Sequence, residues 1–317
     1  MDVDEQHEEP TRAPEPHDII WFSDGNVVIK TDAYLFKVHK GVLSMHSTVF
    51  KDMFELPNVG NPVDEDITGE KTQDLYDGLP VVALMGDEGE HVVHLLRAIY
   101  ELRYHDFNSD EAALGTIVAL LTLGTKYGFE EIRANVITQI SRQFPNSLSE
   151  YDSKDFDWYY DIFGDDHFDS RFELLRVAYK TDAQALLPTL YFACSTYEVQ
   201  YIVEVLRHNF SSGCTETLVT GREKLIQAIN DLSWDIPEYV RAGIENSKCS
   251  AESHCLEKYR NVRLSTLGCE VDLRCTKGSK VVDEELASIC SRCRSFVERA
   301  IEKKRKIVWK KIPSFFK

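Results

Sequence analysis

The sequence lacks two features that would point to a nucleic acid or a membrane. Its 317 residues carry a net charge of −17, whereas nucleic-acid binding depends on Lys and Arg side chains that neutralise phosphates. The long uncharged stretch from Ala112 to Thr125 is shorter than the roughly 17–25 residues that a membrane-spanning helix needs. We therefore expect no membrane partner and no nucleic acid as the main partner, and we interpret this stretch as a buried helix.

The short motifs of common active sites are also missing. The sequence contains no G-x-G-x-x-G, no G-x-x-x-x-G-K-[ST] and no G-x-S-x-G, which are the signatures of phosphate cradles and of the hydrolase nucleophile. His39 has no Cys, His or carboxylate beside it at a spacing suited to catalysis. His91 and His94 are expected on an exposed first turn of a helix. We predict that the protein is not an enzyme, and we assign no catalytic, cofactor-binding or metal residue and no cofactor.

The first residues lack the features of a secretory signal. The segment MDVDEQHEEPTRAPEP has no positive region and no apolar run, so we interpret residues 1–17 as a disordered acidic tail. In a protein that is not secreted, the eight cysteines are more typical of reduced thiols or metal ligands than of disulfides. We expect the protein in the cytoplasm or the nucleus.

What the sequence does contain is typical of a globular protein with two domains. It has 43% hydrophobic residues and exceeds the usual length of about 100–200 residues for one domain. Runs of β-branched and aromatic residues predict strands at about 27–31 and 34–38 and a buried strand in LPVVALMG. Apolar residues at helical spacing predict a helix at about 40–45, a second one that Ser47 caps, and three more between Val92 and Pro145.

A second acidic segment separates the two halves. Residues Glu150 to Asp169 contain eight acids against one Lys, which is typical of a solvated loop. The patterns after this segment are helical, and Pro188 interrupts one of them. We predict a first domain at residues 18–145, an acidic linker at 146–170 and an all-α domain at 171–317.

Six of the cysteines lie between residues 249 and 293. Only Cys290-x-x-Cys293 has the spacing of a structural zinc site. One interpretation is a zinc clip that joins this pair to an earlier pair such as Cys249 and Cys255, with His254 as a further ligand. The other is a set of reduced, partly buried thiols, which the sequence favours.

A basic run lies near the end of the chain. RAIEKKRKIVWKK, from Arg299 to Lys311, contains seven basic residues and one acid. It is either a nuclear-import or nucleic-acid patch or the solvated face of a helix. The sequence favours the second interpretation, in which Val297, Ile301 and Val308 point inward.

The region from residue 34 to 54 carries a specific string of apolar and polar residues. The residues of the string are Phe36, Val38, His39, Leu43, Ser47, Phe50, Met53 and Phe54. This string resembles the signature of the BTB/POZ fold, and the resemblance covers about residues 18–145. More narrowly, the chain is similar to the large set of fungal BTB-domain proteins. The resemblance implies an α+β fold, in which a small β-sheet flanked by helices precedes the all-α domain.

The resemblance also implies a function. BTB/POZ domains bind proteins, often themselves, and some are substrate adaptors for cullin-based ubiquitin ligases. Other proteins are therefore the expected partners, with a homodimer or a cullin among them. His39 and Ser47 would be scaffold residues, while Asp18 and Lys40 correspond to the charged pocket of dimeric members. The alternative is a nuclear regulator whose zinc-clipped, basic C-terminal region contacts nucleic acid.

Overall fold

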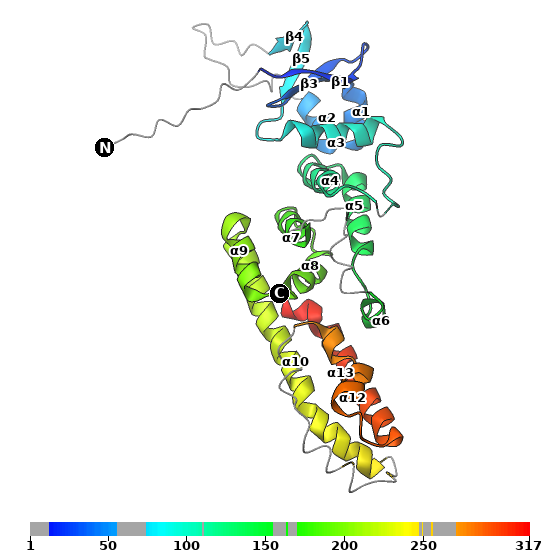
Figure 1. The fold of residues 1–317 in the computed structure, drawn as a ribbon. Coiled ribbons are helices and arrows are strands. Elements are labelled where there is room, and N and C mark those ends of the chain that lie inside the picture. Colours follow the sequence, from blue (N-terminus) through cyan, green and yellow to red (C-terminus); the bar gives the residue numbers. More distant parts are fainter. Residues whose placement is uncertain are drawn as a thin grey trace, which may run out of the picture. The chain divides into compact units, whose positions relative to one another are not determined.

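The chain divides into two compact units, Met1–Gln139 and Ile140–Lys317 (Figure 1). The computed structural model describes residues 13–55, 74–109, 111–154, 163, 170–246, 249, 255 and 271–317. Most of the predicted acidic tail and of the predicted linker lies outside these residues. The division between the units falls inside a helix at Gln139, whereas the sequence placed the end of the first domain at residue 145.

A mixed five-stranded sheet forms the first part of the first unit. Its strand order is β1-β3-β2-β5-β4, and the prediction of a small sheet flanked by helices is confirmed. The strands are β1 (Glu15–Trp21), β2 (Val27–Lys30), β3 (Tyr34–Val38), β4 (Leu75–Tyr76) and β5 (Leu79–Ala83). The predicted strands at 27–31 and 34–38 are present as β2 and β3. β1 begins inside the range assigned to the tail, because its parallel pairing with β3 depends on tertiary structure and not on local pattern.

The central position of β2 explains why its side chains do not alternate between apolar and polar. β2 pairs antiparallel with β3 and parallel with β5, so both of its edges lie inside the sheet, and elements packed on the sheet cover its two faces. Val27, Val28 and Ile29 are all fully buried, as is typical of a strand inside a sheet. The turn between β2 and β3 is fixed by Thr31, whose hydroxyl accepts a hydrogen bond from the Tyr34 amide at 3.0 Å.

Five helices complete the first unit or continue from it. They are α1 (Lys40–His46), α2 (Thr48–Glu55), α3 (Gly89–Tyr100), α4 (Leu114–Lys126) and α5 (Glu130–Arg142). Ser47 separates α1 from α2, and its hydroxyl accepts a hydrogen bond from the Phe50 amide at 2.9 Å, which confirms the predicted cap. The same hydroxyl donates to the Tyr127 carbonyl. One small side chain therefore ties the start of α2 to the turn after α4.

Phe50 packs against the same turn after α4 that Ser47 contacts. It is 1% exposed, and its ring centroid lies 5.0 Å from that of Tyr127 and 5.9 Å from that of Phe129. Full burial of a Phe side chain contributes roughly 1.5–3 kcal/mol. Phe50 thus joins α2 to the turn between α4 and α5 through apolar contacts.

We expect Phe50→Ala to lower the free energy of unfolding by about 3–5 kcal/mol, because it removes buried area and leaves a cavity. Urea melting followed by circular dichroism measures the change. Val49→Ala is the matched control, since Val49 is 36% exposed on the same helix and its truncation should cost less than about 0.5 kcal/mol. Equal effects of the two substitutions would contradict this packing.

The second unit is helical throughout its described residues, which confirms the predicted all-α region. Its helices are α6 (Leu148–Tyr151), α7 (Ser170–Lys180), α8 (Leu187–Ser195), α9 (Val199–Asn209), α10 (Ser212–Asn246), the 3₁₀ helix η4 (Leu273–Thr276), α12 (Gly278–Glu285) and α13 (Ser291–Phe315). Pro188 lies in the first turn of α8, where a missing amide costs nothing. No helix in the described part of the chain is both long and apolar enough to cross a membrane.

The long helices α10 and α13 lie side by side in opposite directions (Figure 1). Gly221 near the start of α10 meets Phe316 just after α13, and Gly243 near the end of α10 meets Phe296 near the start of α13. A Cβ atom at Gly221 would collide with the Phe316 ring, so any larger residue there would require this ring to move. Between the two ends, the Lys304 ammonium pairs with an Asp235 carboxylate oxygen at 3.0 Å.

The basic run of α13 has an apolar inner face, as predicted. Val297, Ile301 and Val308 are at most 3% exposed. The expectation that the charges of the run are solvated is wrong for Arg305, whose side chain is 0% exposed. The sequence could not reveal this burial, because two of the groups that bind Arg305, Asp152 and the Leu273 carbonyl, are distant in sequence.

Three elements meet at the Arg305 guanidinium. Its Nη2 atom lies 2.6 Å from Asp152 Oδ1 and donates to the Leu273 carbonyl at 3.0 Å. Its Nη1 atom lies 2.8 Å from Glu302 Oε2. Burial alone would lower the pKa of Arg305, but the hydrogen bonds and charges of Asp152 and Glu302 raise it above its ordinary value. Arg305 thus joins α13 to the segment after α6 and to η4.

We expect Arg305→Ala to destabilise the second unit by about 3–5 kcal/mol, because removal of the buried partner leaves two half-buried carboxylates without a counter-charge. Lys306→Ala is the control, since Lys306 is exposed on the neighbouring position of the same helix and should change stability by less than about 0.5 kcal/mol. Urea melting of both variants distinguishes this network from an ordinary basic surface. An R305A variant as stable as K306A would show that the network carries no stability.

Candidate functional site

The residues of the BTB-like string meet at the corner between β3 and α1. Phe36, Val38, Leu43 and Phe50 are buried, while Met53 and Phe54 are half-buried. The His39 amide donates to the Tyr100 hydroxyl at 3.0 Å. The His39 ring packs beside those of Phe22 and Tyr100, with centroids 5.3 Å and 5.9 Å away. His39 therefore fastens the end of β3 to α3 through its backbone and its ring.

An acid lies beside His39 that the sequence analysis did not place there. Asp24 Oδ1 is 3.2 Å from His39 Nε2, and the Asp24 side chain is 82% exposed. The pKa of Asp24 is lowered by a hydrogen bond from its own amide and then by His39. An ion pair this exposed contributes little to stability. The pair orients the imidazole, while the aromatic rings around it favour a structural role over acid–base chemistry.

Asp18 and Lys40, the residues expected at a dimer pocket, lie on different elements. Asp18 is exposed on β1, and Lys40 is the half-buried first residue of α1. The Lys40 amide donates to Asn26 Oδ1 at 2.8 Å, and its ammonium lies 5.8 Å from the Phe54 ring centroid. Among the residues that the structure describes, no ion pair joins Asp18 to Lys40. Their shared role stays a prediction.

The first unit has a groove between the end of α1, the end of α3 and the start of α5. Its volume is about 630 Å³, and its walls come from residues 44–48, from the end of α3 with the turn after it, and from residues 128–132. Two large apolar side chains border it with most of their surface in water: Met45 is 73% exposed and Leu102 is 98% exposed. Contiguous exposed apolar surface of this kind is typical of interaction sites.

The groove carries negative charge on one side. Glu130 and Glu131 line it from the first turn of α5 and are exposed. Gly128 forms the turn before them with a φ of +66°, a conformation that favours glycine. The groove was not predicted from the sequence. Leu102, an isolated apolar residue in the polar segment ELRYHD, was the one local signal that could have indicated it.

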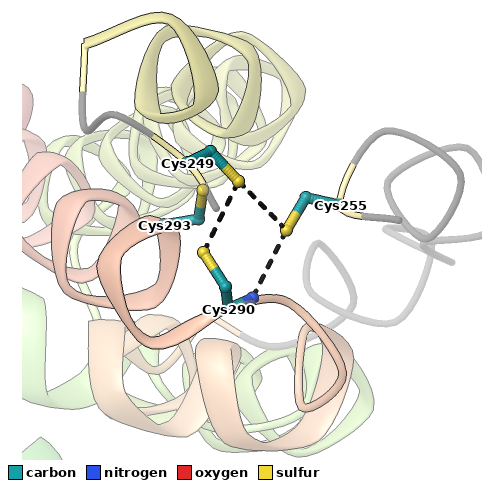
Figure 2. A group of neighbouring side chains, drawn as sticks. All are labelled: Cys249, Cys255, Cys290 and Cys293. Carbon is teal, nitrogen blue, oxygen red and sulfur yellow. Dashed lines mark hydrogen bonds between the residues drawn. The ribbon is translucent and has the colours of Figure 1, made fainter. Parts of the chain in front are cut away.

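Four cysteines converge in the second unit (Figure 2). Cys249 follows α10, Cys290 is the N-cap of α13, Cys293 lies in the first turn of α13, and Cys255 comes from the segment between these helices. Their four Sγ atoms all lie within 4.8 Å of one another. These are the two pairs that the sequence analysis considered for a zinc clip. His254 and Cys269 lie outside the described residues.

The cysteines differ in their surroundings. Cys255 and Cys293 are fully buried, whereas Cys249 and Cys290 are half-buried. The Cys249 Sγ atom lies 3.6 Å from those of both Cys255 and Cys290, and the Cys290 amide donates to Cys255 Sγ at 3.3 Å. A hydrogen bond from the Cys293 amide is the main cause that lowers the pKa of Cys290 to about 6. Burial raises the pKa of Cys255.

One family of known proteins matches part of this structure. Residues 22–79, which include β2, β3, α1 and α2, match the model of the BTB/POZ domain. The chain contains a BTB/POZ domain. BTB/POZ domains are protein–protein interaction modules and are typically non-catalytic, and the match indicates no enzymatic family. No curated protein and no solved structure matches the chain.

His94, in the first unit, differs from its expected exposure. It is half-buried in α3, and its Nδ1 atom forms a hydrogen bond with the Tyr104 hydroxyl and lies 3.3 Å from Thr116 Oγ1. Burial is the main cause that lowers the pKa of His94 below its ordinary value of 6.5. The folded chain therefore resists protonation at this position.

We expect His94 to make stability depend on pH. Below about pH 6.5 the unfolded chain takes up a proton that the folded chain refuses, so the free energy of unfolding falls as the pH drops from there through the lower folded pKa. His94→Asn should weaken this loss between about pH 7.5 and pH 5.5. Urea melts of both proteins at the two pH values measure it. Identical losses in the variant and the native chain would contradict the assignment.

Proposed function

We propose that the protein binds other polypeptides through the groove of its first unit and acts as a non-catalytic interaction module. The observation that carries the proposal is the combination of a BTB/POZ match with the exposed pair Met45 and Leu102 at the border of a 630 Å³ groove. A helical segment that lays an apolar face into a groove is a common form of peptide recognition. The groove between α1, α3 and α5 suits such a segment.

The negative charges beside the groove indicate which charges a bound segment carries. Glu130 and Glu131 lie beside its apolar wall, so a bound segment gains from Lys or Arg next to its apolar anchor residues. A strongly acidic segment would be repelled by these residues and by the net charge of −17. The proposed partner is therefore a helical segment with large apolar side chains and flanking basic residues.

Two more specific proposals concern which proteins the chain binds. The resemblance to BTB/POZ proteins, including the fungal set, supports a role as substrate adaptor for a cullin-based ubiquitin ligase, and it supports a homodimer in which Asp18 and Lys40 take part. Residues 56–73, where a cullin contact would be sought, lie outside the described residues. Co-precipitation with cullins tests the first role. Light scattering of the native chain and of Lys40→Glu tests the second.

We expect the double substitution Met45→Glu and Leu102→Glu to lower the recovery of groove-bound partners at least about fivefold, since loss of an anchor side chain commonly costs more than 1 kcal/mol. Proximity labelling in cells followed by quantitative mass spectrometry measures recovery. Met85→Glu is the matched control, because Met85 is 76% exposed in the same unit and does not line the groove. An unchanged set of partners for the double variant would refute the groove as the binding site.

A second candidate function rests on the exposed basic side chains of α13. Lys303, Lys306 and Lys310 are exposed at helical spacing, and the four cysteines lie at the start of the same helix. A nuclear regulator that contacts nucleic acid would use this stripe. The burial of Arg305 and the pairing of Lys304 with Asp235 reduce the charge available. Salt-dependent binding of DNA or RNA by the full chain, lost in a triple Lys→Ala variant, would support this function.

A further inference from the structure

The four cysteines close the open end of the α10–α13 pair. α10 ends at Asn246, three residues before Cys249, and α13 begins at Ser291, directly after Cys290. The antiparallel direction of the two helices brings these ends together, as the contact between Gly243 and Phe296 shows. The thiols therefore come from segments that are far apart in the sequence and adjacent in the fold.

The distances between the sulfur atoms fit one tetrahedral ion. A Zn–S bond of about 2.3 Å implies about 3.8 Å between any two sulfurs of a tetrahedral site. Two of the Sγ–Sγ distances are 3.6 Å, and all six pairs lie within 4.8 Å. A disulfide would need about 2.05 Å, and all four residues are free cysteines.

The surroundings of the thiols favour their charged form. The Cys290 amide points at Cys255 Sγ, and a hydrogen bond from an amide stabilises a thiolate more than a neutral thiol. Cys290 and Cys293 also lie at the N-terminus of a 25-residue helix, where unpaired amides and the helix dipole stabilise negative charge. Two backbone features thus independently support thiolates at these positions.

We propose that Cys249, Cys255, Cys290 and Cys293 bind one structural Zn²⁺ ion that joins the end of α10 to the start of α13. Four thiolates leave no open coordination position, which is typical of a structural and not a catalytic site. The cysteines border a buried apolar cluster that includes Ile244, Ile289 and Val297. The ion would hold this cluster closed at the end of the helix pair, where binding and folding are coupled.

The first experiment measures metal in the full chain. The protein is produced in zinc-containing medium without an oligohistidine tag, purified under reducing conditions and dialysed against a weak chelator. Inductively coupled plasma mass spectrometry should find about one zinc ion per chain. Replacement of zinc by Co²⁺ should produce the visible absorption bands of a tetrahedral thiolate site. A strong chelator should release the metal and lower the melting temperature of the second unit.

Substitutions then assign the ligands. Cys290→Ser and Cys249→Ser should each reduce bound zinc to less than about one fifth of the native content, because four protein ligands form the site. Cys290→His should retain zinc, since imidazole replaces thiolate in structural sites. Cys275→Ala is the control, because Cys275 is a buried cysteine of the same unit outside the cluster. Circular dichroism confirms that each variant is folded.

Several results would overturn the proposal. The first is native protein that holds no zinc even after reduction and incubation with Zn²⁺. Iron in place of zinc would replace it with a mononuclear iron–thiolate site, since four tetrahedral sulfur ligands also accept iron. Disulfides among the four cysteines in freshly purified reduced protein, found by mass spectrometry, would exclude it. Should Cys290→Ser prove insoluble, zinc in native and Cys290→His protein, measured against Cys275→Ala, still decides the outcome.

Discussion

Each unit is organised around a buried polar side chain that must find its hydrogen bonds inside the protein. In the first unit this is Ser47, whose hydroxyl serves the Phe50 amide and the Tyr127 carbonyl. In the second unit it is Arg305, which binds Asp152, Glu302 and the Leu273 carbonyl. A buried polar group without a partner costs about 1–3 kcal/mol, so each of these side chains permits only helix arrangements that supply its partners.

The consequence for the first unit is the shape of its surface. Ser47 holds the junction of α1 and α2 against the turn after α4, and that junction is one wall of the groove. Phe50, which Ser47 positions, fills the interior, whereas Met45 on α1 is left in water. An apolar side chain that the fold leaves exposed beside a concave surface is available to a partner. The scaffold motif thus shapes the groove at which we propose that a partner binds.

Local patterns in the sequence were sufficient for most elements but not for the sites. β2, β3 and the helices from α1 to α5 follow from periodicity and capping, because those signals lie within a few residues of one another. β1 was not foreseen since its pairing with β3 is tertiary, and the burial of Arg305 was not foreseen since Asp152 and Leu273 are distant in sequence. The cysteine spacing indicated only the pair Cys290 and Cys293, and only the direction of α10 and α13 brings this pair to Cys249 and Cys255. Exposure at Met45 and Leu102 depends likewise on how three helices pack.

Helix α10 is locally destabilised near the end that the cysteine cluster adjoins. Pro237 lies inside α10, where a proline removes a backbone hydrogen bond and costs about 3 kcal/mol. α10 nevertheless continues, because Ile236 and Val240 on either side of the proline are buried in the apolar cluster that α13 completes. Tertiary packing therefore maintains this half of the helix, and that packing persists only while the start of α13 stays beside the end of α10. A link between the two ends at Cys249 and Cys290 acts where local helix propensity is least able to hold them.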